Sequence, residues 1–404
     1  MLVKAEGATT YGCRMEMLHL RSPRRIAFAR LILAGVGGFL ALGASYAIVP
    51  PLVKGELGGT DVIVGWTITV FAVAALLARF GAGFGIDRRG ARLVYAVGFG
   101  FIALGGALFF VAQNDSVLYV ARALQGVGQA CMFTAGLTWA VYLAPVHRRG
   151  QAISLFGLSV WAGLSLGPVV AQLLIDHVGL WAAEWLLVLA PMLALVSMLG
   201  MLGPPVHPES AGISFPREAF RPGLGLMFGG VVMAAIVGFA VLTFDFRDGG
   251  GGAYVIGAYG AATFIGRIVL GHLPDRLGSY RTGVLAFIFA LIGISIIGIA
   301  PTWWLACVGA VICGAAWSLL FPALALMAID RTSAHRRGAA LAVYTAGFDL
   351  GFAAAGPLMG NVANTSGYGA VYAVAALFAL GGLVLILFSR SAATAAATDP
   401  ELNS

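Results

Sequence analysis

One acidic side chain, Asp349, lies near the middle of an apolar segment that is long enough to cross a lipid bilayer. A carboxylate inside a membrane either pairs with a cation or takes up a proton. Proton uptake and release at such a depth is the chemistry that a proton-coupled carrier requires. The alternative is a structural polar bond between helices, for which Arg267 is the candidate partner.

A second charged residue, Arg122, lies within another apolar segment, in the third of that segment expected to be nearest the outer surface. A cation at this depth costs at least a few kcal/mol (about 2.5–3.5 on insertion scales) and is not expected to contact lipid. A functional interpretation, proton coupling together with Asp349, is implied by the resemblance of the motif that contains Arg122, which is described below. The alternatives are snorkelling to the outer interface and a structural bond to the backbone of the first helix.

Aromatic and amide side chains at helical depth are candidates for a substrate cavity between two helical halves. Large aromatic rings suit amphipathic or planar ligands, although ordinary helix packing explains any one of them equally well. The candidate residues are Gln125, Gln129, Trp139, Trp161, Trp317, Phe321, Tyr344 and Phe348.

The composition decides which solvent surrounds these residues. The 404 residues are 60% hydrophobic and 10% charged, whereas a soluble domain is roughly 25% charged. We therefore predict an all-α membrane protein of about twelve transmembrane helices, at roughly 20 apolar residues each. The apolar runs fall at 28–50, 62–83, 93–112, 117–143, 150–175, 181–202, 223–245, 252–273, 283–300, 303–329, 338–362 and 369–389.

These runs group into two six-helix bundles, 28–202 and 223–389, joined by a polar linker at 203–222. Residues 1–27 and 390–404 are the predicted tails. With both termini in the cytoplasm, the outer loops hold only Lys54 and Arg247, so the net charge of +7 reflects orientation in the membrane rather than nucleic-acid binding. A bacterial inner membrane is the expected location.

The two halves repeat each other at a nearly constant offset along the chain. Arg79, Gly83, Asp87, Arg88 and Gly90 recur at one offset as Arg267, Gly271, Asp275, Arg276 and Gly278. His147–Gly150 recurs as His335–Gly338 at the same offset, and Gly167-Pro168 recurs as Gly356-Pro357 with one position more. Such matches indicate an internal duplication, which is common in secondary transporters. Two positions separated by the offset between Arg79 and Arg267 are called equivalent below.

Three motifs resemble those of the major facilitator superfamily over nearly the whole chain. Gly83–Arg92 resembles its loop signature between the second and third helices, and Arg122-Ala-Leu-Gln125-Gly126-Val-Gly128 resembles its RxxQGxG motif. Gly163-Leu-Ser-Leu-Gly167-Pro168 resembles the GxxxGP motif of its proton-driven efflux branch. The resemblance implies two pseudo-symmetric bundles that exchange access to one central site.

The same resemblance implies an inner gate at the repeated loop. The predicted gating residues are Gly83, Asp87, Arg88, Gly90, Gly271, Asp275, Arg276, Gly278 and Asp330. Asp87 is expected to face the start of the eleventh helix, and Arg276 to pair with Asp330. The alternative is a basic loop that only sets the topology.

The helix-five motif allows two interpretations. The one that the family resemblance implies is that the bend at Pro168 controls leak and direction. The alternative is that Gly163 and Gly167 only make a smooth groove for close helix packing.

We therefore predict a secondary active transporter, not an enzyme, that exports a small organic molecule in exchange for protons. A sugar or organic-acid importer and a transport-inactive sensor are the alternatives. Acidic residues that carry protons in drug exporters often lie on helices one or four, and this chain has none on either. No GxxxxGK[ST] loop is present, so ATP is not the expected energy source. No cofactor and no metal site are expected, the expected partners are substrate, protons and lipid, and a monomer is the default.

Overall fold

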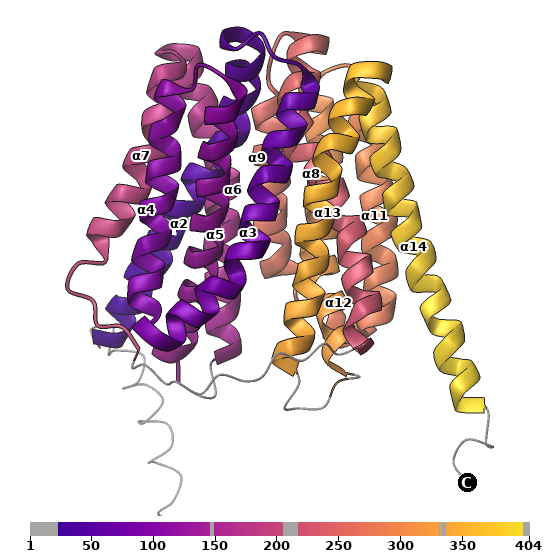
Figure 1. Cartoon of the computed structure of the whole chain (residues 1–404). Helices are drawn as coiled ribbons and strands as arrows, with labels where there is room; N and C mark the ends of the chain where they lie inside the picture. The colour runs from indigo at the N-terminus through magenta and orange to yellow at the C-terminus, as the bar shows by residue number, and fades with distance from the viewer. Residues whose placement is uncertain (1–22, 146–148, 205–216, 331, 333–336, 399–404) are drawn as a thin grey trace, which may run out of the picture.

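The computed structural model describes residues 23–145, 149–204, 217–330, 332 and 337–398 (Figure 1). Within them lie twelve long helices, a short helix α10 (Leu273–Leu277) and three short 3₁₀ or π segments. The long helices are α2 (Pro23–Pro51), α3 (Asp61–Arg89), α4 (Ala91–Ala107), α5 (Asp115–Leu143), α6 (Arg149–His177), α7 (Leu180–Ser197), α8 (Phe220–Asp248), α9 (Gly252–Val269), α11 (Ser279–Ile299), α12 (Trp303–Asp330), α13 (Arg337–Ser366) and α14 (Tyr368–Thr398).

The helices are those of a multi-pass membrane protein. Ten of the described helical segments are long and apolar enough to cross a bilayer by length and composition. The two long helices outside that set, α5 and α13, are the ones that carry Arg122 and Asp349. Large apolar side chains such as Leu77 and Leu193 are 66% and 68% exposed, which suits a surface facing lipid.

Two equivalent bundles make up the fold, α2–α7 and α8–α14. In the first, α2 packs on α6 and α5 packs on α3 and α4; in the second, α8 packs on α13 and α12 packs on α9 and α11. The backbone contacts repeat too. A Cβ added to Gly126 would lie 2.2 Å from the Phe71 carbonyl oxygen, and one added to Gly314 would lie 2.3 Å from that of Tyr259. Both members of the second pair are at positions equivalent to the first, so the predicted duplication is confirmed in space.

The most extensive contacts between the bundles are those of two helix pairs, α3 with α13 and α6 with α9. They are equivalent under the duplication, since α3 corresponds to α9 and α13 to α6. We call the end of the protein at which α7 ends and α8 begins the linker end, and the opposite end the far end. The turns at Gly90 and Gly278, whose φ angles are 86° and 82°, both lie at the linker end. Glycine is the residue that adopts such angles without strain, as the sequence predicted.

The far ends of the bundles are packed together, whereas the linker ends are apart. A Cβ on Gly65 of α3 would lie 2.1 Å from the Gly356 carbonyl oxygen on α13, and one on Gly260 of α9 would lie 2.8 Å from Ser165 of α6. Near the linker end, a Cβ on Gly81 or Gly83 would meet nothing within 4 Å. In Figure 1 the two halves correspondingly approach at the top and spread toward the bottom, where α14 ends.

A polar contact reinforces the far-end closure. The Tyr368 hydroxyl of α14 donates a hydrogen bond of 3.1 Å to Asp61 Oδ1 at the start of α3, and Lys54 Nζ lies 2.8 Å from the same oxygen. The described residues therefore form a conformation that is closed at the far end.

Several boundaries differ from the sequence prediction, among them the end of the second helix, which was expected at 83 and lies at Arg89. The last helix was expected to end by 389, but α14 continues to Thr398, because the Ala-rich stretch after Arg390 has high helix propensity. The sixth helix was expected to reach 202, but α7 ends at Ser197. Residues 1–22, 205–216 and 399–404 of the predicted tails and linker lie outside the described residues.

Candidate functional site

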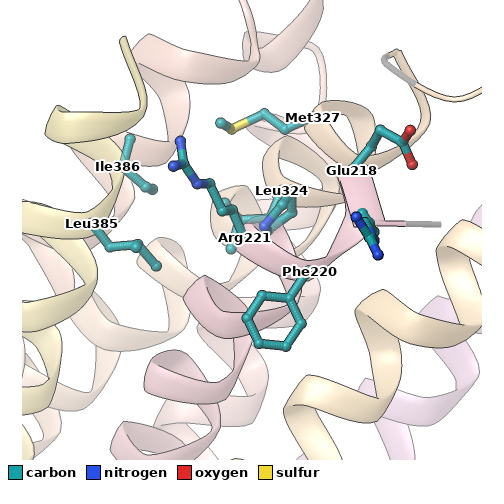
Figure 2. Close-up of a pocket in the computed structure, with 9 residues that line it drawn as sticks. Glu218, Phe220, Arg221, Leu324, Met327, Leu385 and Ile386 are labelled. Atoms are coloured by element: carbon teal, nitrogen blue, oxygen red, sulfur yellow. The ribbon is translucent and has the colours of Figure 1, made fainter. Parts of the chain in front are cut away.

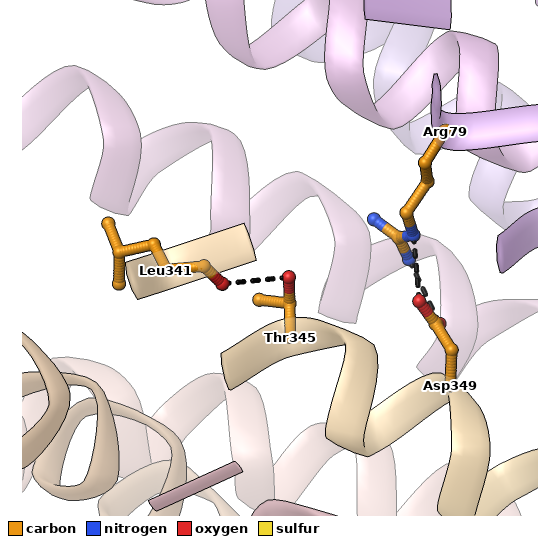
Figure 3. Close-up of polar contacts among 4 residues, drawn as sticks. All are labelled: Arg79, Leu341, Thr345 and Asp349. Carbon is orange, nitrogen blue, oxygen red and sulfur yellow. Dashed lines mark hydrogen bonds and ion pairs between the residues drawn. The ribbon is translucent and has the colours of Figure 1, made fainter. Parts of the chain in front are cut away.

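An ion pair between the bundles occupies the middle of the α3–α13 interface (Figure 3). Arg79 Nε lies 2.8 Å from Asp349 Oδ2, and Arg79 Nη2 donates a hydrogen bond of 3.1 Å to Oδ1. Asp349 is only 4% exposed. At 1.5 Å per residue, the two Cα atoms lie about 15–18 Å along their helices from the linker end, which is about half the thickness of a bilayer core.

The pairing corrects the partner expected for Asp349. The expected candidate was Arg267, but the cation that reaches Asp349 is Arg79, from the other half of the chain. Sequence reasoning placed Arg79 among the repeated residues and gave it no role. A cation and an acid on helices of different bundles can be paired only once the α3–α13 contact is known.

Arg79 and Arg267 occupy equivalent surroundings in the two halves. The Arg79 guanidinium lies 5.7 Å from the ring centre of Phe133, and that of Arg267 lies 5.5 Å from Phe321, the equivalent of Phe133. The second rings match as well. Phe133 packs on Phe156 with centres 6.0 Å apart, and Phe321 packs on Tyr344 at 5.5 Å.

The two arginines differ in their counter-charge. The position equivalent to Asp349 is Trp161 on α6, so no acid stands there. Within the described parts of the chain, the ion pairs are Lys54–Asp61 and Arg79–Asp349, and Arg267 belongs to neither. The Arg267 Nε is buried and has no hydrogen-bond partner there.

Beside Arg267 lies a continuous aromatic cluster drawn from α6, α9, α12 and α13. Trp161 packs edge-on against Tyr259 and Trp317, with ring centres 5.9 and 6.3 Å apart. Trp317 also contacts Phe321 at 6.4 Å and Phe348 at 5.5 Å. The structure thus brings together Trp161, Trp317, Phe321, Tyr344 and Phe348 of the predicted cavity set, and adds Tyr259, which the sequence analysis missed.

Comparison with known proteins identifies the family. The family model described as Major Facilitator Superfamily matches residues 31–247 and 223–402. The chain belongs to the Major Facilitator Superfamily. Membership implies a small-molecule substrate and a multi-pass membrane protein.

Curated relatives and solved structures agree with this assignment. An uncharacterised MFS-type transporter of Salmonella typhimurium is 29% identical over 371 residues, covering 89% of this chain and 96% of its own. One from Burkholderia mallei is 28% identical over 368 residues, covering 88% and 90%. The fold is similar to that of a mutant of the nucleoside transporter NupG (TM-score 0.76, 12% identity, 89% and 99% covered) and of the human organic anion transporter MFSD10 (0.65, 14%, 91% and 100%).

Arg122 of this superfamily member is fixed inside the first bundle. It is 1% exposed, and its Nη1 donates hydrogen bonds of 2.7 Å to Ser45 Oγ of α2 and to Gln125 Oε1. Its guanidinium also lies 4.7 Å from the ring centre of Phe71. Snorkelling is therefore wrong for this conformation, and the bond to the first helix is made through a side chain. Its role in proton coupling stays a prediction.

Other predicted cavity residues lie apart from the aromatic cluster. Trp139 is completely buried within the first bundle and packs on Tyr95 with ring centres 6.1 Å apart, so in this conformation it lies in the core of that bundle, and a cavity role stays a prediction. Gln125 is completely buried beside Arg122. Gln129 Oε1 is buried without a hydrogen-bond partner in the described residues.

The residues of the predicted inner gate form no ion pair with one another among the described residues. Arg88 lies over the ring of Phe84 on its own helix, 4.1 Å from the ring centre, and Asp87 forms no ion pair in the described part of the chain. Arg276 and Asp330 are both exposed, and the expected ion pair between them is absent from the described residues. The turn at Gly278 follows α10, which contains Asp275; the side chain of Asp275 lies outside the described parts, and the gating role of Gly271 is untested. Gating remains a prediction.

The helix-five motif forms a packing notch. A Cβ on Gly163 would lie 2.6 Å from the Leu40 nitrogen, and one on Gly167 would lie 2.3 Å from the Leu40 carbonyl oxygen on α2. Pro168 lies inside α6. The two glycines therefore allow close packing of α6 on α2, while control of leak and direction stays a prediction.

A pocket of about 340 Å³ lies at the linker end of the second bundle (Figure 2). Arg217 and Arg221 line it at the start of α8, with apolar side chains of α12 and α14 around them. All its lining residues belong to one bundle or its leading segment, so it is separate from the interface that holds Asp349 and Arg267.

Proposed function

We propose that this protein is a proton-coupled secondary transporter that moves a small organic molecule across a bacterial inner membrane by alternating access. In this proposal both termini are cytoplasmic, so the linker end faces the cytoplasm and the conformation described above is open inward. The excess of basic residues at the linker end supports this orientation.

The Arg79–Asp349 ion pair is the observation that carries the proposal. It connects α3 of one bundle to α13 of the other at mid-depth, so its formation and loss act directly on the relative position of the bundles. Ionised Asp349 attracts Arg79 and holds the helices together. A proton on Asp349 removes this attraction and leaves a hydrogen bond in its place. Uptake and release of a proton therefore bias the bundles between two arrangements.

Export is the proposed direction, and its support is the Gly163-Leu-Ser-Leu-Gly167-Pro168 motif on α6. In the proposed cycle, Arg122 keeps the first bundle rigid through Ser45 and Gln125 while the bundles rock. Asp87 and Asp275 then meet the opposing helices when the linker end closes.

Transport by proteoliposomes tests the proposal. Purified protein is reconstituted with a trapped pH-sensitive dye, a pH gradient is imposed, and a panel of radiolabelled organic anions, cations and neutral sugars is offered. We expect at least one compound to move against its gradient with an opposite proton flux. The Asp349→Asn variant should lose gradient-driven transport and keep exchange of labelled for unlabelled substrate. Gradient-driven transport that is unchanged in Asp349→Asn would contradict the proposal.

A further inference from the structure

We infer that Arg267 binds an anionic group of the substrate, so that this transporter carries an organic anion with a flat apolar part. This inference rests on the transport function proposed above and specifies its substrate class. In the bound state, the substrate carboxylate would stand at Arg267 as the Asp349 carboxylate stands at Arg79.

The duplication supplies the first line of argument. Arg79 and Arg267 sit on equivalent helices, each over an equivalent phenylalanine, and each faces a helix of the other bundle. Packing confirms that positions of α6 and α13 near the acid are equivalent in space. Gly163 of α6 contacts Phe39 of α2, and the equivalent Gly351 of α13 contacts the equivalent Met227 of α8. Trp161 therefore takes the place of Asp349, and the second interface has the cation without the acid.

The cost of that missing acid is the second line. A half-buried guanidinium in the membrane interior is expensive unless a counter-charge or hydrogen-bond acceptors compensate it. The contact with the Phe321 ring compensates only part of this cost, because a cation–π contact gives the N–H donors of the guanidinium no acceptor. The Tyr344 hydroxyl already donates its proton to the Phe321 carbonyl oxygen at 2.6 Å. An anionic ligand supplies the missing compensation.

Space for such a ligand group is the third line. The residue of α6 next to the Arg267 side chain is Gly157, where an added Cβ would lie 3.4 Å from Nη1. Because Gly157 has no side chain, no side chain at that position covers the edge of the planar guanidinium, whose N–H donors bind a carboxylate best.

The aromatic cluster defines the rest of the ligand. Trp161 comes from the first bundle, whereas Trp317, Phe321 and Phe348 come from the second. A flat ring lying on this cluster with its carboxylate at Arg267 contacts both bundles. Binding therefore acts on the α6–α9 interface as the ion pair acts on α3–α13.

Binding of a matched set of probes to the purified full-length protein tests the inference. The probes are 1-naphthoate and benzoate as anions, 1-naphthamide as the neutral counterpart and 1-naphthylmethylamine as the cation, with radiolabelled 1-naphthoate as the reporter in a scintillation proximity assay. We expect 1-naphthoate to bind at least tenfold more tightly than 1-naphthamide, and the amine not to compete.

Variants place the anion site at Arg267. Arg267→Gln should weaken 1-naphthoate binding at least tenfold and leave 1-naphthamide unchanged, and Arg267→Lys should restore part of the loss. Arg281→Gln removes an exposed arginine from the linker end of the same bundle and should bind as the parent does. Equal affinity of the parent for naphthoate and naphthamide, no binding of either carboxylate, or unchanged binding by a folded Arg267→Gln protein would each overturn the inference.

The outcome is separable from that of the proposed function. If neutral compounds are transported with proton coupling and Arg267→Gln leaves this unchanged, the anion site is wrong and the transport function stands. If naphthoate binds through Arg267 but Asp349→Asn has unaltered gradient-driven transport, proton coupling at Asp349 is wrong and the anion site stands.

Discussion

The α3–α13 and α6–α9 interfaces are equivalent under the internal duplication and differ in one charged residue. Both carry an arginine over a phenylalanine, but only the first contains an acid. In the α3–α13 interface Asp349 neutralises Arg79, so its net charge changes when a proton binds. In the α6–α9 interface no acid neutralises Arg267, so its net charge changes when an anion binds. A difference at one duplicated position, Asp349 in one half and Trp161 in the other, thus places the proposed proton site and the proposed substrate site in different interfaces.

The largest expected effect is the loss of one partner from the neutralised interface. Arg79→Ala leaves Asp349 buried without a counter-charge, and Asp349→Ala does the same to Arg79, which costs about 3–5 kcal/mol. The double variant should be more stable than either single one, because no charge is left unpaired. Arg267→Ala should cost less, since no ion pair is broken in the unliganded protein.

Thermal unfolding in detergent micelles, followed by circular dichroism, measures this comparison. The order of stability should be parent, double variant, then the two single variants. If the four proteins unfold together, the ion pair does not stabilise this conformation.

The second expected effect concerns the closed far end against the open linker end. Gly65→Ala places a methyl group against the Gly356 carbonyl oxygen and should destabilise the far-end contact by about 1–3 kcal/mol, the usual cost of overpacking. Gly83→Ala adds the same methyl group to the same helix where nothing lies within 4 Å, so it is the matched control for this conformation.

Hydrogen–deuterium exchange with mass spectrometry reads the result locally. Gly65→Ala should raise exchange in the far-end halves of α3 and α13, while Gly83→Ala should not. Equal exchange in both variants would show that the far-end packing does not hold this conformation.

The sequence alone predicted the helices, because apolar runs are a property of local composition. It also predicted the duplication, because the same residues recur at a nearly constant offset. Predicting twelve helices from twelve apolar runs requires only that unpaired backbone groups are costly in lipid. Predicting the turns at Gly90 and Gly278 requires only the presence of glycine between two such runs. The ion pair was different. Asp349 was found by its depth in an apolar run, but its partner depended on which helices of the two bundles meet.

The different places of the predicted cavity residues have the same origin. Trp139 and Trp161 are both tryptophans within apolar helices, yet Trp139 packs inside the first bundle on Tyr95 and Trp161 contacts Trp317 of the second bundle. Helix rotation decides between them, and the hydrophobic pattern of a helix surrounded by lipid and protein carries little information on rotation. The sequence repeat showed that Arg267 is equivalent to Arg79. That Arg267 lacks an acidic partner could be recognised only by comparing the α3–α13 and α6–α9 interfaces in the structure.

A third prediction supplies the second interface with the acid it lacks. Gly157→Asp places a carboxylate next to the Arg267 guanidinium, whereas Gly157→Asn places an uncharged group of the same shape there. The aspartate should compete with an anionic ligand and weaken 1-naphthoate binding about tenfold more than the asparagine, which corresponds to about 1.4 kcal/mol. Equal binding by the two variants would mean that charge at Arg267 does not select the ligand.

The last prediction distinguishes contacts within a bundle from contacts between bundles at the far end, and its Lys54 variant has the smallest expected effect. Lys54 and Tyr368 both bind Asp61 Oδ1, but Lys54 belongs to the same bundle as Asp61 and Tyr368 to the other. Lys54→Met removes a partly exposed ion pair and should cost less than about 1 kcal/mol, an effect that high salt should abolish. Tyr368→Phe removes a hydrogen bond to a charged group, about 1.5–3 kcal/mol, in any salt.

Of these two substitutions, only Tyr368→Phe should favour opening of the far end. Tyr368 bonds to Asp61 across the bundles, whereas Lys54 bonds to it within one bundle. The same exchange experiment should therefore show faster exchange at the start of α3 in Tyr368→Phe and no change there in Lys54→Met at high salt. If Lys54→Met opened the far end as much as Tyr368→Phe, the closure would depend on the charge balance around Asp61 rather than on bonds across the interface. The Arg79–Asp349 pair would then share its role with a second electrostatic contact.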